Sequence, residues 1–369
     1  MSNDVTLLRH GLILAGLIFV LFGPKHLATG AEVTTATLGT QPYLLQLIRD
    51  DAVYEELRLS DAKIARVREA IAEVDPRWWV SRILPAERQS SEISQLTQIL
   101  LNRLRTILDE DELNRLNQLY CQANGSRMVR LDDVAAALDL TRTQRQSFEK
   151  LFDETDAEML AIQKDLNDKT INAEQANREI ATEQRNEQLA LFDILTPEQE
   201  TRLGSLIGKT FDLGKIKRTF PRAPEFQPQG AKWLAGGPVR MESLRGKVVV
   251  VFFYAFECIN CQRNFPHYLA WHDDMADDVV IIGIQRPETR AEGDAGLVSQ
   301  AMLKDGFEFP VLFDAQSSNW NAWANTMWPT TYLIDKDGFI RRWWQGEMNW
   351  QGIQGEQQMR ASIESLIAE

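Results

Sequence analysis

The sequence predicts two domains: an all-α helical region with an internal duplication, followed by an α/β domain in which helices flank a central mixed sheet. The length of 369 residues is about twice that of an ordinary domain. Residues 42–213 carry apolar side chains at spacings of three and four, the pattern of amphipathic helices. After a segment rich in Pro and Gly, runs of β-branched and aromatic residues replace this pattern, as expected of buried strands.

Composition and charge narrow the class of protein. Hydrophobic residues make up 44% and charged residues 25% of the chain, which is ordinary for a globular protein and excludes wholesale disorder. The 40 Lys and Arg against 53 Asp and Glu give a net charge of -13, the wrong sign for a phosphate-binding surface. Because of this negative charge, we expect no nucleic acid among the partners. Three cysteines are too few for a scaffold held together by disulfides.

Residues 1–31 predict a signal peptide or a signal anchor. Arg9 and His10 precede an apolar run over residues 11–23, about 13 residues where a membrane span needs roughly 20. Small residues at 28–31 offer a cleavage point, although Lys25 and His26 make cleavage less favourable. We therefore expect an exported protein, either periplasmic or associated with the membrane through this segment and facing the periplasm or the cell exterior.

The helical region, residues 42–213, carries helix-start signals and an internal duplication. Two capping boxes begin with Thr141 and Thr196, each with Gln three residues later. At an offset of 81, Asp51, Val53, Leu57, Leu59 and Ser60 correspond to Asp132, Val134, Leu138, Leu140 and Thr141. At an offset of 87, Leu104, Ile107, Leu108, Arg115, Leu116 and Leu119 correspond to Leu191, Ile194, Leu195, Arg202, Leu203 and Leu206. Two helical repeats of about 80 residues explain this pattern. The Leu-Thr-x-x-Gln starts resemble the LTxxQ repeats of periplasmic Spy/CpxP-like proteins.

No catalytic constellation occurs in this region. Its many carboxylates are typical of a solvated helix surface, and Cys121 is expected to be a small buried apolar residue. The sequence therefore predicts that the helical region binds protein or separates the next domain from the membrane.

The α/β domain is predicted over residues 220–369, after a Pro/Gly-rich linker and domain entrance at 214–238. Its elements follow in the order strand, helix, strand, with a terminal hairpin and helix, which is typical of a thioredoxin-like fold. The expected strands are 247–254, 279–284, 309–314, 330–335 and 339–344, and the expected helices follow Cys261 as far as Trp271 and cover 359–367.

A pair of cysteines, Cys258 and Cys261, lies where a buried strand ends and a helix begins. Unpaired backbone N–H groups and the helix dipole should favour the Cys258 thiolate and depress its pKa. Cys261 lies one turn later, close enough for a disulfide, so Cys258 is expected to attack a target disulfide and Cys261 to resolve the product. Zinc usually needs a second pair of ligands. No metal and no cofactor are predicted; a metal site with His267 or His272, or a purely structural disulfide, stays open as an alternative.

Trp328, Pro329 and Thr330 are the candidate substrate groove. Thioredoxin folds hold a cis-proline facing the cysteines just before a strand, and Pro329 lies at such a position. A trans proline ahead of an edge strand is the alternative. Pro266 is expected to kink or shorten the helix that follows the cysteines.

Residues 253–263, with the sequence FYAFECINCQR, resemble the TlpA/ResA-type redoxins. They are still more similar to thioredoxin-like domains of the DipZ type, whose active site reads Cys-Ile-Asn-Cys. The resemblance extends over residues 220–369. It implies a thioredoxin fold and extracytoplasmic thiol–disulfide exchange with Cys258 and Cys261 as the redox pair. It is also compatible with a membrane electron donor of the DsbD/CcdA type.

Three residues depart from the family pattern. Glu257 places a carboxylate next to the first cysteine, where it should oppose thiolate formation, so we treat it as a candidate for tuning the pair. Phe252 replaces the buried Asp that thioredoxin uses in proton transfer. Trp328 stands where TlpA-like proteins commonly have a small residue. Most of the tryptophans in residues 320–350 are expected in the core rather than in the groove.

The sequence thus predicts an exported thiol–disulfide oxidoreductase that exchanges disulfides with thiol- or disulfide-containing proteins. One alternative is a chaperone-like or protein-binding helical module with a regulatory redoxin domain. A peroxiredoxin-like peroxidase is another, although Val251 and Ala255 occupy the Pro and Thr positions of the Pro-x-x-x-Thr-x-x-Cys site that such enzymes share.

Overall fold

The computed structural model describes residues 42–369, so the signal segment predicted at residues 1–31 lies outside the described residues. The described chain forms two compact units. One comprises residues 42–71 and Thr97–Lys217, and the other comprises Ala72–Leu96 and Arg218–Glu369. Across residues 42–369 no helix is both long and apolar enough to cross a membrane.

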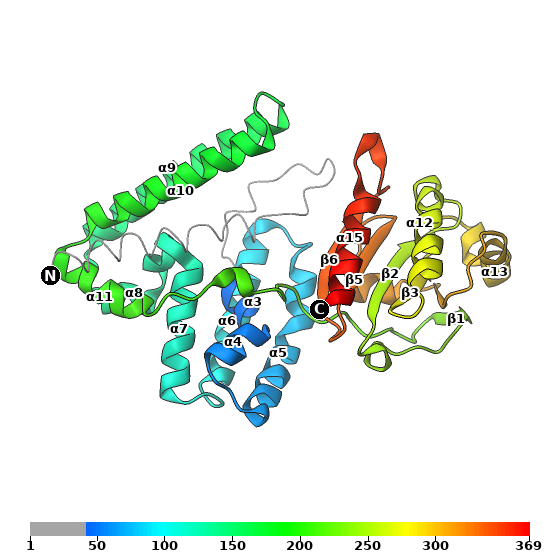
Figure 1. Ribbon diagram of the computed structural model, residues 1–369, viewed down its shortest axis with the longest axis horizontal. Coiled ribbons are helices and arrows are strands. Elements are labelled where there is room, and N and C mark those ends of the chain that lie inside the picture. The colour runs from blue at the N-terminus through cyan, green and yellow to red at the C-terminus, as the bar shows by residue number, and fades with distance from the viewer. Residues whose placement is uncertain (1–41) are drawn as a thin grey trace. The chain divides into compact units, whose positions relative to one another are not determined.

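The first unit is all-helical, as predicted. Helices α5 and α6 contribute residues to both units, and α9 and α10 form a long antiparallel hairpin (Figure 1). The α-helices of this part of the chain are α3 (Tyr43–Leu47), α4 (Asp51–Glu56), α5 (Asp61–Ser81), α6 (Ala86–Leu104), α7 (Glu110–Asn124), α8 (Asp132–Ala137), α9 (Arg142–Asn167), α10 (Ala173–Ile194) and α11 (Pro197–Ile207).

Both predicted capping boxes are present. The Thr141 hydroxyl accepts from the backbone N–H of Gln144 at 3.2 Å, and the Gln144 side chain accepts from the N–H of Thr141 at 3.1 Å. Thr196 and Gln199 make the same reciprocal pair at the start of α11. These bonds satisfy N–H groups that the first turn of a helix leaves without a partner. Cys121 is buried among apolar residues of this unit, as expected.

Local features recur at the offsets found in the sequence. The turns after α4 and α8 each contain a residue in the left-handed region, Arg58 at φ 55° and Asp139 at φ 53°, which lie 81 positions apart. The capping box that begins α7 with Asp109 lies 87 positions before the one at Thr196. The duplication stays a prediction, and this recurrence supports it.

The second unit contains a mixed six-stranded sheet in the order β1-β4-β3-β2-β5-β6. Strand β2 pairs parallel with β3 and antiparallel with β5, and β3 pairs parallel with β4. The strands are β1 (Ala231–Ala235), β2 (Val248–Tyr254), β3 (Val279–Gln285), β4 (Val311–Asp314), β5 (Thr330–Ile334) and β6 (Ile340–Gln345); the helices are α12 (Ile259–Met275), α13 (Ala295–Lys304), α14 (Ser318–Ala322) and α15 (Gly355–Ala368). The predicted α/β class is confirmed.

Strand β2 is buried on both faces because its side chains alternate between two hydrophobic cores. Val248, Val250 and Phe252 face the core that contains Tyr268 of α12 and Ile363 of α15. These two helices lie on the same side of the sheet (Figure 1). The intervening residues of β2 enter the second core, where they meet aromatic residues that include Phe226, Trp320, Trp323 and Tyr332.

Two details differ from the sequence-based expectations. The linker predicted at residues 214–238 contains β1, an edge strand that pairs antiparallel with β4. Gly230 and Gly236, with φ 62° and 60°, provide the turns on either side of it, so the glycines that indicated a linker bound a strand. Pro266 does not shorten the helix after the cysteines, because α12 continues to Met275.

The predicted helical domain, residues 42–213, also needs a correction. Ala72–Leu96 lie inside this range but group with the second unit. The physical reason is Trp79, which is buried in the core between the sheet and α14, with its ring 5.9 Å from that of Tyr332. An amphipathic pattern shows which face of a helix is apolar, but not what that face packs against.

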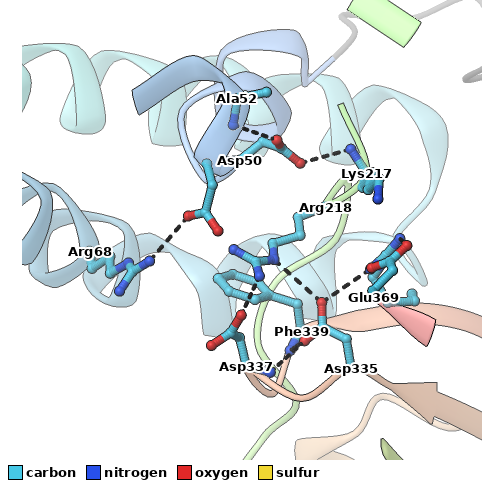
Figure 2. A network of polar contacts seen from close by, with 11 residues as sticks. Asp50, Ala52, Arg68, Lys217, Arg218, Asp335, Asp337, Phe339 and Glu369 are labelled. Atoms are coloured by element: carbon cyan, nitrogen blue, oxygen red, sulfur yellow. Dashed lines mark hydrogen bonds and ion pairs between the residues drawn. The ribbon is translucent and has the colours of Figure 1, made fainter. Parts of the chain in front are cut away.

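Ion pairs fix the chain where the second unit begins. The Arg218 guanidinium pairs with the carboxylates of Asp335 and Asp337 at the turn between β5 and β6, and it lies over the Phe339 ring at 4.9 Å (Figure 2). Asp335 also accepts from the backbone N–H of Phe339 at 2.8 Å. Because Asp335 is buried, these contacts compensate its carboxylate for the loss of water.

Candidate redox site

Cys258 is the N-cap residue of α12, with φ -73° and ψ 111°. It follows the buried strand β2 after a short turn, so its position at a strand–helix junction is as predicted. Cys258 is half-buried, Cys261 is fully buried, and both are free thiols. One thiol can thus be reached from solvent while the other is enclosed in the core beside α12.

The surroundings favour the thiolate of Cys258. The hydrogen bond from the Cys261 thiol does most to lower the pKa of Cys258, and the backbone N–H groups of Cys261 and Asn260 act in the same direction. Desolvation and the negative charge of Glu288 oppose them. The net effect lowers the pKa of Cys258 from 9.0 to about 7. This agrees with the depressed pKa expected at a helix N-terminus.

Cys261 has the opposite bias. Its burial, together with the hydrogen bond that it donates to Cys258, raises its pKa far above the usual value. Phe252 is fully buried beneath the site and stacks on Tyr268 with ring centroids 3.9 Å apart. No carboxylate therefore occupies the Phe252 position, as the sequence indicated. The two thiols are chemically distinct: Cys258 is a nucleophile at neutral pH and Cys261 is a protonated partner.

Glu257 and Glu288 are the carboxylates to consider beside the pair, and the sequence points only to Glu257. The Glu257 side chain is exposed and accepts a hydrogen bond from the Thr289 hydroxyl at 2.6 Å. The carboxylate whose charge raises the pKa of Cys258 is that of Glu288, in the loop after β3. The negative charge that opposes the thiolate thus comes from Glu288, a residue distant in the sequence, and the tuning role expected of Glu257 stays a prediction.

Glu292 was not singled out from the sequence, yet it organises this loop. Its side chain is fully buried and accepts from the backbone N–H of Glu257 at 2.8 Å, of Glu288 at 2.7 Å and of Thr289 at 2.8 Å. It therefore ties the residue before Cys258 to the loop after β3. A solvated surface glutamate and a buried one look alike in sequence, so no local signal identifies it.

The predicted groove residues lie at the same end of the sheet as the cysteines. Thr330 pairs with Phe253 near the end of β2, and the Trp328–Pro329 peptide bond before it is cis. The Thr330 hydroxyl donates to the carbonyl of Met327 at 2.8 Å. Trp328 and Cys258, both partly buried, pack against the same core. The structure thus brings the segment around Pro329 to the edge from which Cys258 starts α12.

The Trp328 ring is contacted by one other indole and by one guanidinium. Its centre lies 4.4 Å from that of the Trp320 ring, and the Arg286 guanidinium lies 4.8 Å from the ring centre of Trp328. Part of the Trp328 side chain therefore packs against Trp320 and Arg286. The prediction that the tryptophans are mostly core holds for Trp323 and Trp344, whereas Trp350 is exposed.

No metal centre is formed by the part of the chain that the structure describes. Within residues 42–369 no group of three or more His, Cys, Asp and Glu side chains is placed to hold a metal ion.

Part of this chain is similar to known proteins. The family model of AhpC/TSA matches residues 221–343. Protein DipZ of Mycobacterium tuberculosis (strain CDC 1551 / Oshkosh) is 38% identical over 105 residues, which are 28% of this chain and 15% of DipZ. The thiol-disulfide oxidoreductase YkuV of Bacillus subtilis (strain 168) is 23% identical over 123 residues, 33% of this chain and 82% of YkuV.

A solved thioredoxin-like protein in its oxidized form covers 40% of this chain and 95% of its own, with 21% identity and a TM-score of 0.36. The match to DipZ covers only 15% of the length of DipZ. Residues 221–343, which include both cysteines and most of the mixed sheet, thus match the AhpC/TSA family over a third of this chain.

Proposed function

We propose that this protein is a thiol–disulfide oxidoreductase that exchanges disulfides with protein substrates through Cys258 and Cys261. The observation that carries the proposal is the asymmetry of the pair: a half-buried thiol whose pKa is lowered to about 7, hydrogen-bonded to a buried thiol whose pKa is raised. The similarity to YkuV, a thiol-disulfide oxidoreductase, supports the same reaction class.

The cycle follows from this asymmetry. The Cys258 thiolate attacks one sulfur of a target disulfide, forms a mixed disulfide, and releases the other target sulfur as a thiolate that takes up a proton. Cys261 then loses its proton and attacks the Cys258 sulfur. This step releases the second target thiolate and closes the Cys258–Cys261 disulfide. The target gains two electrons and two protons, and a dithiol donor must restore the reduced pair.

Loss of the Cys261 proton is the difficult step, because its pKa is raised in the free dithiol. Phe252 offers no acceptor in the core. We infer that water, or the departing target thiolate, accepts this proton. Trp328, Pro329 and Thr330 form the groove that holds the target next to Cys258. The negative charge of Glu288 opposes the thiolate, and Glu257 stays a candidate for tuning the pair.

The finer parts of the proposal depend on the sequence. The apolar run at residues 11–23 supports export, with the protein in the periplasm or held at the membrane and facing outward. The family resemblance supports a membrane donor of the DsbD/CcdA type as the source of the two electrons. The helical unit is proposed to bind protein partners or to position the redoxin domain.

The test is trapping of the exchange intermediate by the full chain. We expect reduced wild-type protein to reduce a disulfide-bonded peptide, and Cys261→Ser to accumulate a mixed disulfide through Cys258 that mass spectrometry locates. Cys258→Ser should form no adduct. Cys121→Ser is the matched control and should retain full exchange, because Cys121 is buried in the other unit. A Cys258→Ser protein that still reduces the peptide would refute the mechanism.

Thiol trapping across a redox buffer series gives the direction of electron flow. A potential near -270 mV indicates a reductase, whereas one near -120 mV indicates an oxidant of exported proteins. Failure of the two cysteines to pair in this range would overturn the proposal. Turnover of hydrogen peroxide without peptide reduction would favour the peroxiredoxin-like alternative, and suppression of client aggregation by a Cys258→Ser protein would favour the chaperone-like one.

A further inference from the structure

The segment that precedes the cis proline is held by residues from far earlier in the chain. Trp323 and Ala324 follow α14 and lead through Met327 and Trp328 to Pro329. The carbonyl of Trp323 accepts from the Trp79 indole N–H at 3.0 Å. Trp79 belongs to Ala72–Leu96, the part of the sequence-predicted helical domain that groups with the redoxin unit.

Arg82, one turn after Trp79, makes the larger contribution. Its Nη2 donates to the carbonyl of Trp323 at 2.7 Å, to the carbonyl of Ala324 at 2.8 Å and to the hydroxyl of Tyr332 at 2.9 Å. The guanidinium also lies over the Trp79 ring, 3.9 Å from its centre. In the part of the chain that the structure describes, Arg82 has no carboxylate partner. Its charge is thus directed entirely at backbone carbonyls, a phenol and aromatic faces.

The carbonyls that Arg82 binds belong to an unusual turn. Ala324 has φ 48°, in the left-handed region that is sterically unfavourable for an L-residue. Its neighbour Asn325 accepts from the Tyr332 hydroxyl at 2.6 Å, so Tyr332 links Arg82 to the next residue of the same segment. Removal of Arg82 would leave the Trp323 and Ala324 carbonyls without their charged donor where the backbone is already strained.

The same segment is part of the candidate substrate groove. Pro329 and Thr330 follow it directly, and Thr330 pairs with Phe253 near the end of β2, close to the start of α12. Any shift of residues 323–328 would therefore displace the backbone beside Cys258 without touching either thiol.

We propose that Arg82 is a positioning residue for the substrate groove: it fixes residues 323–328, and through them the cis-proline segment, so that the redoxin domain depends on a part of the chain outside residues 221–343. The proposal rests on the proposed function for its effect on catalysis. The positioning itself can be measured without any activity. Trp79 assists by orienting the guanidinium and by donating to one of the same carbonyls.

The experiment compares three variants of the full chain with wild type. Arg82→Met keeps the length and apolar stem of the side chain but has no donors. Arg82→Lys keeps the charge and three donors. Arg77→Met is the matched control, because Arg77 lies near the end of α5, shortly before Arg82 and in the same unit. Its guanidinium makes exposed contacts, to Glu92 at 2.7 Å and to Gln95 at 3.5 Å.

Hydrogen–deuterium exchange of the backbone amides in residues 319–328 measures how firmly this segment is held. The amides of Trp323, Ala324 and Asn325 donate to carbonyls within this segment and so report its opening. We expect exchange of these amides to be about 10- to 100-fold faster in Arg82→Met. It should be unchanged in Arg77→Met and partly restored in Arg82→Lys. Unchanged exchange in Arg82→Met, in a protein with wild-type circular dichroism, would overturn the proposal.

Steady-state kinetics with the disulfide-bonded peptide measure the effect of the groove on substrate binding. We expect Arg82→Met to raise KM about tenfold while the rate of Cys258 alkylation by iodoacetamide stays within twofold of wild type, because the groove moves and the thiol does not. A merely destabilised protein would lose active molecules without a change in KM. A KM equal to that of wild type would overturn the link to the groove. Absence of peptide reduction by the wild-type protein would refute the proposed function. Hydrogen–deuterium exchange would then still test whether Arg82 fixes residues 323–328.

Discussion

The hydrogen bond from Cys261 to Cys258 supports a sharp prediction about the reactivity of the nucleophile. Since this bond is the largest cause that lowers the pKa of Cys258 to about 7, Cys261→Ala should raise that pKa, whereas Cys261→Ser keeps a donor and should change it less. A hydrogen bond to a charged group contributes about 1.5–3 kcal/mol, and one pKa unit corresponds to about 1.4 kcal/mol. Cys258 is only half-buried, so we expect the lower end of this range: a pKa near 8 in Cys261→Ala.

The sign of the pH dependence follows from the thiolate. Below its pKa Cys258 is a thiol and alkylates slowly, and above it the reactive thiolate dominates. In wild type about half of Cys258 is ionised at pH 7, and in Cys261→Ala about a tenth. A thiolate of higher pKa is a better nucleophile by about threefold per unit, so the rate at pH 7 falls only about twofold. The midpoint of the pH profile therefore carries the prediction.

The assay is iodoacetamide alkylation of the reduced full chain from pH 5 to 10, resolved by site with mass spectrometry. Cys121 provides an internal control, because burial raises its pKa to about 11 and it should stay unmodified over most of this range. The expected midpoints are about 7 for wild type and Cys261→Ser and about 8 for Cys261→Ala. A wild-type midpoint near 9, or identical midpoints for Cys261→Ala and Cys261→Ser, would refute the assignment of the bond.

Three further predictions concern stability, each measured by chemical denaturation of the full chain. Glu292→Gln should lower the free energy of unfolding of the second unit by about 2–3 kcal/mol, because the side-chain NH2 group of Gln cannot accept from the backbone N–H groups that the Glu292 carboxylate binds. An unchanged denaturation midpoint would contradict the buried network. Thr196→Ala should cost about 1 kcal/mol through the lost cap of α11, whereas Thr201→Ala on the same helix should cost less, and equal losses would argue against the cap. Phe252→Asp, which restores the acidic residue of thioredoxin, should cost more than about 4 kcal/mol, since it removes a stacked ring and buries a carboxylate; a stable, fully folded variant would contradict the packing of this core.

The sequence by itself determined those features that depend on neighbouring residues. The run from Val248 to Tyr254 is predicted as a strand buried on both faces, because all of its side chains are β-branched or aromatic. The pair at Cys258 and Cys261 had to span the start of a helix, and the caps at Thr141 and Thr196 follow from spacing alone. Each of these needs only local periodicity and the hydrogen bonds of one turn.

The tertiary structure decided the contacts between distant residues. Glu292 reaches the residue before Cys258 across 35 positions, and Arg82 reaches Tyr332 across 250. Neither has a sequence signature, because a charged side chain on a helix or loop is usually solvated, and only the folded chain shows which one loses its water. The composition of residues 231–235 likewise does not predict β1, because this edge strand of five residues is defined by its pairing with β4.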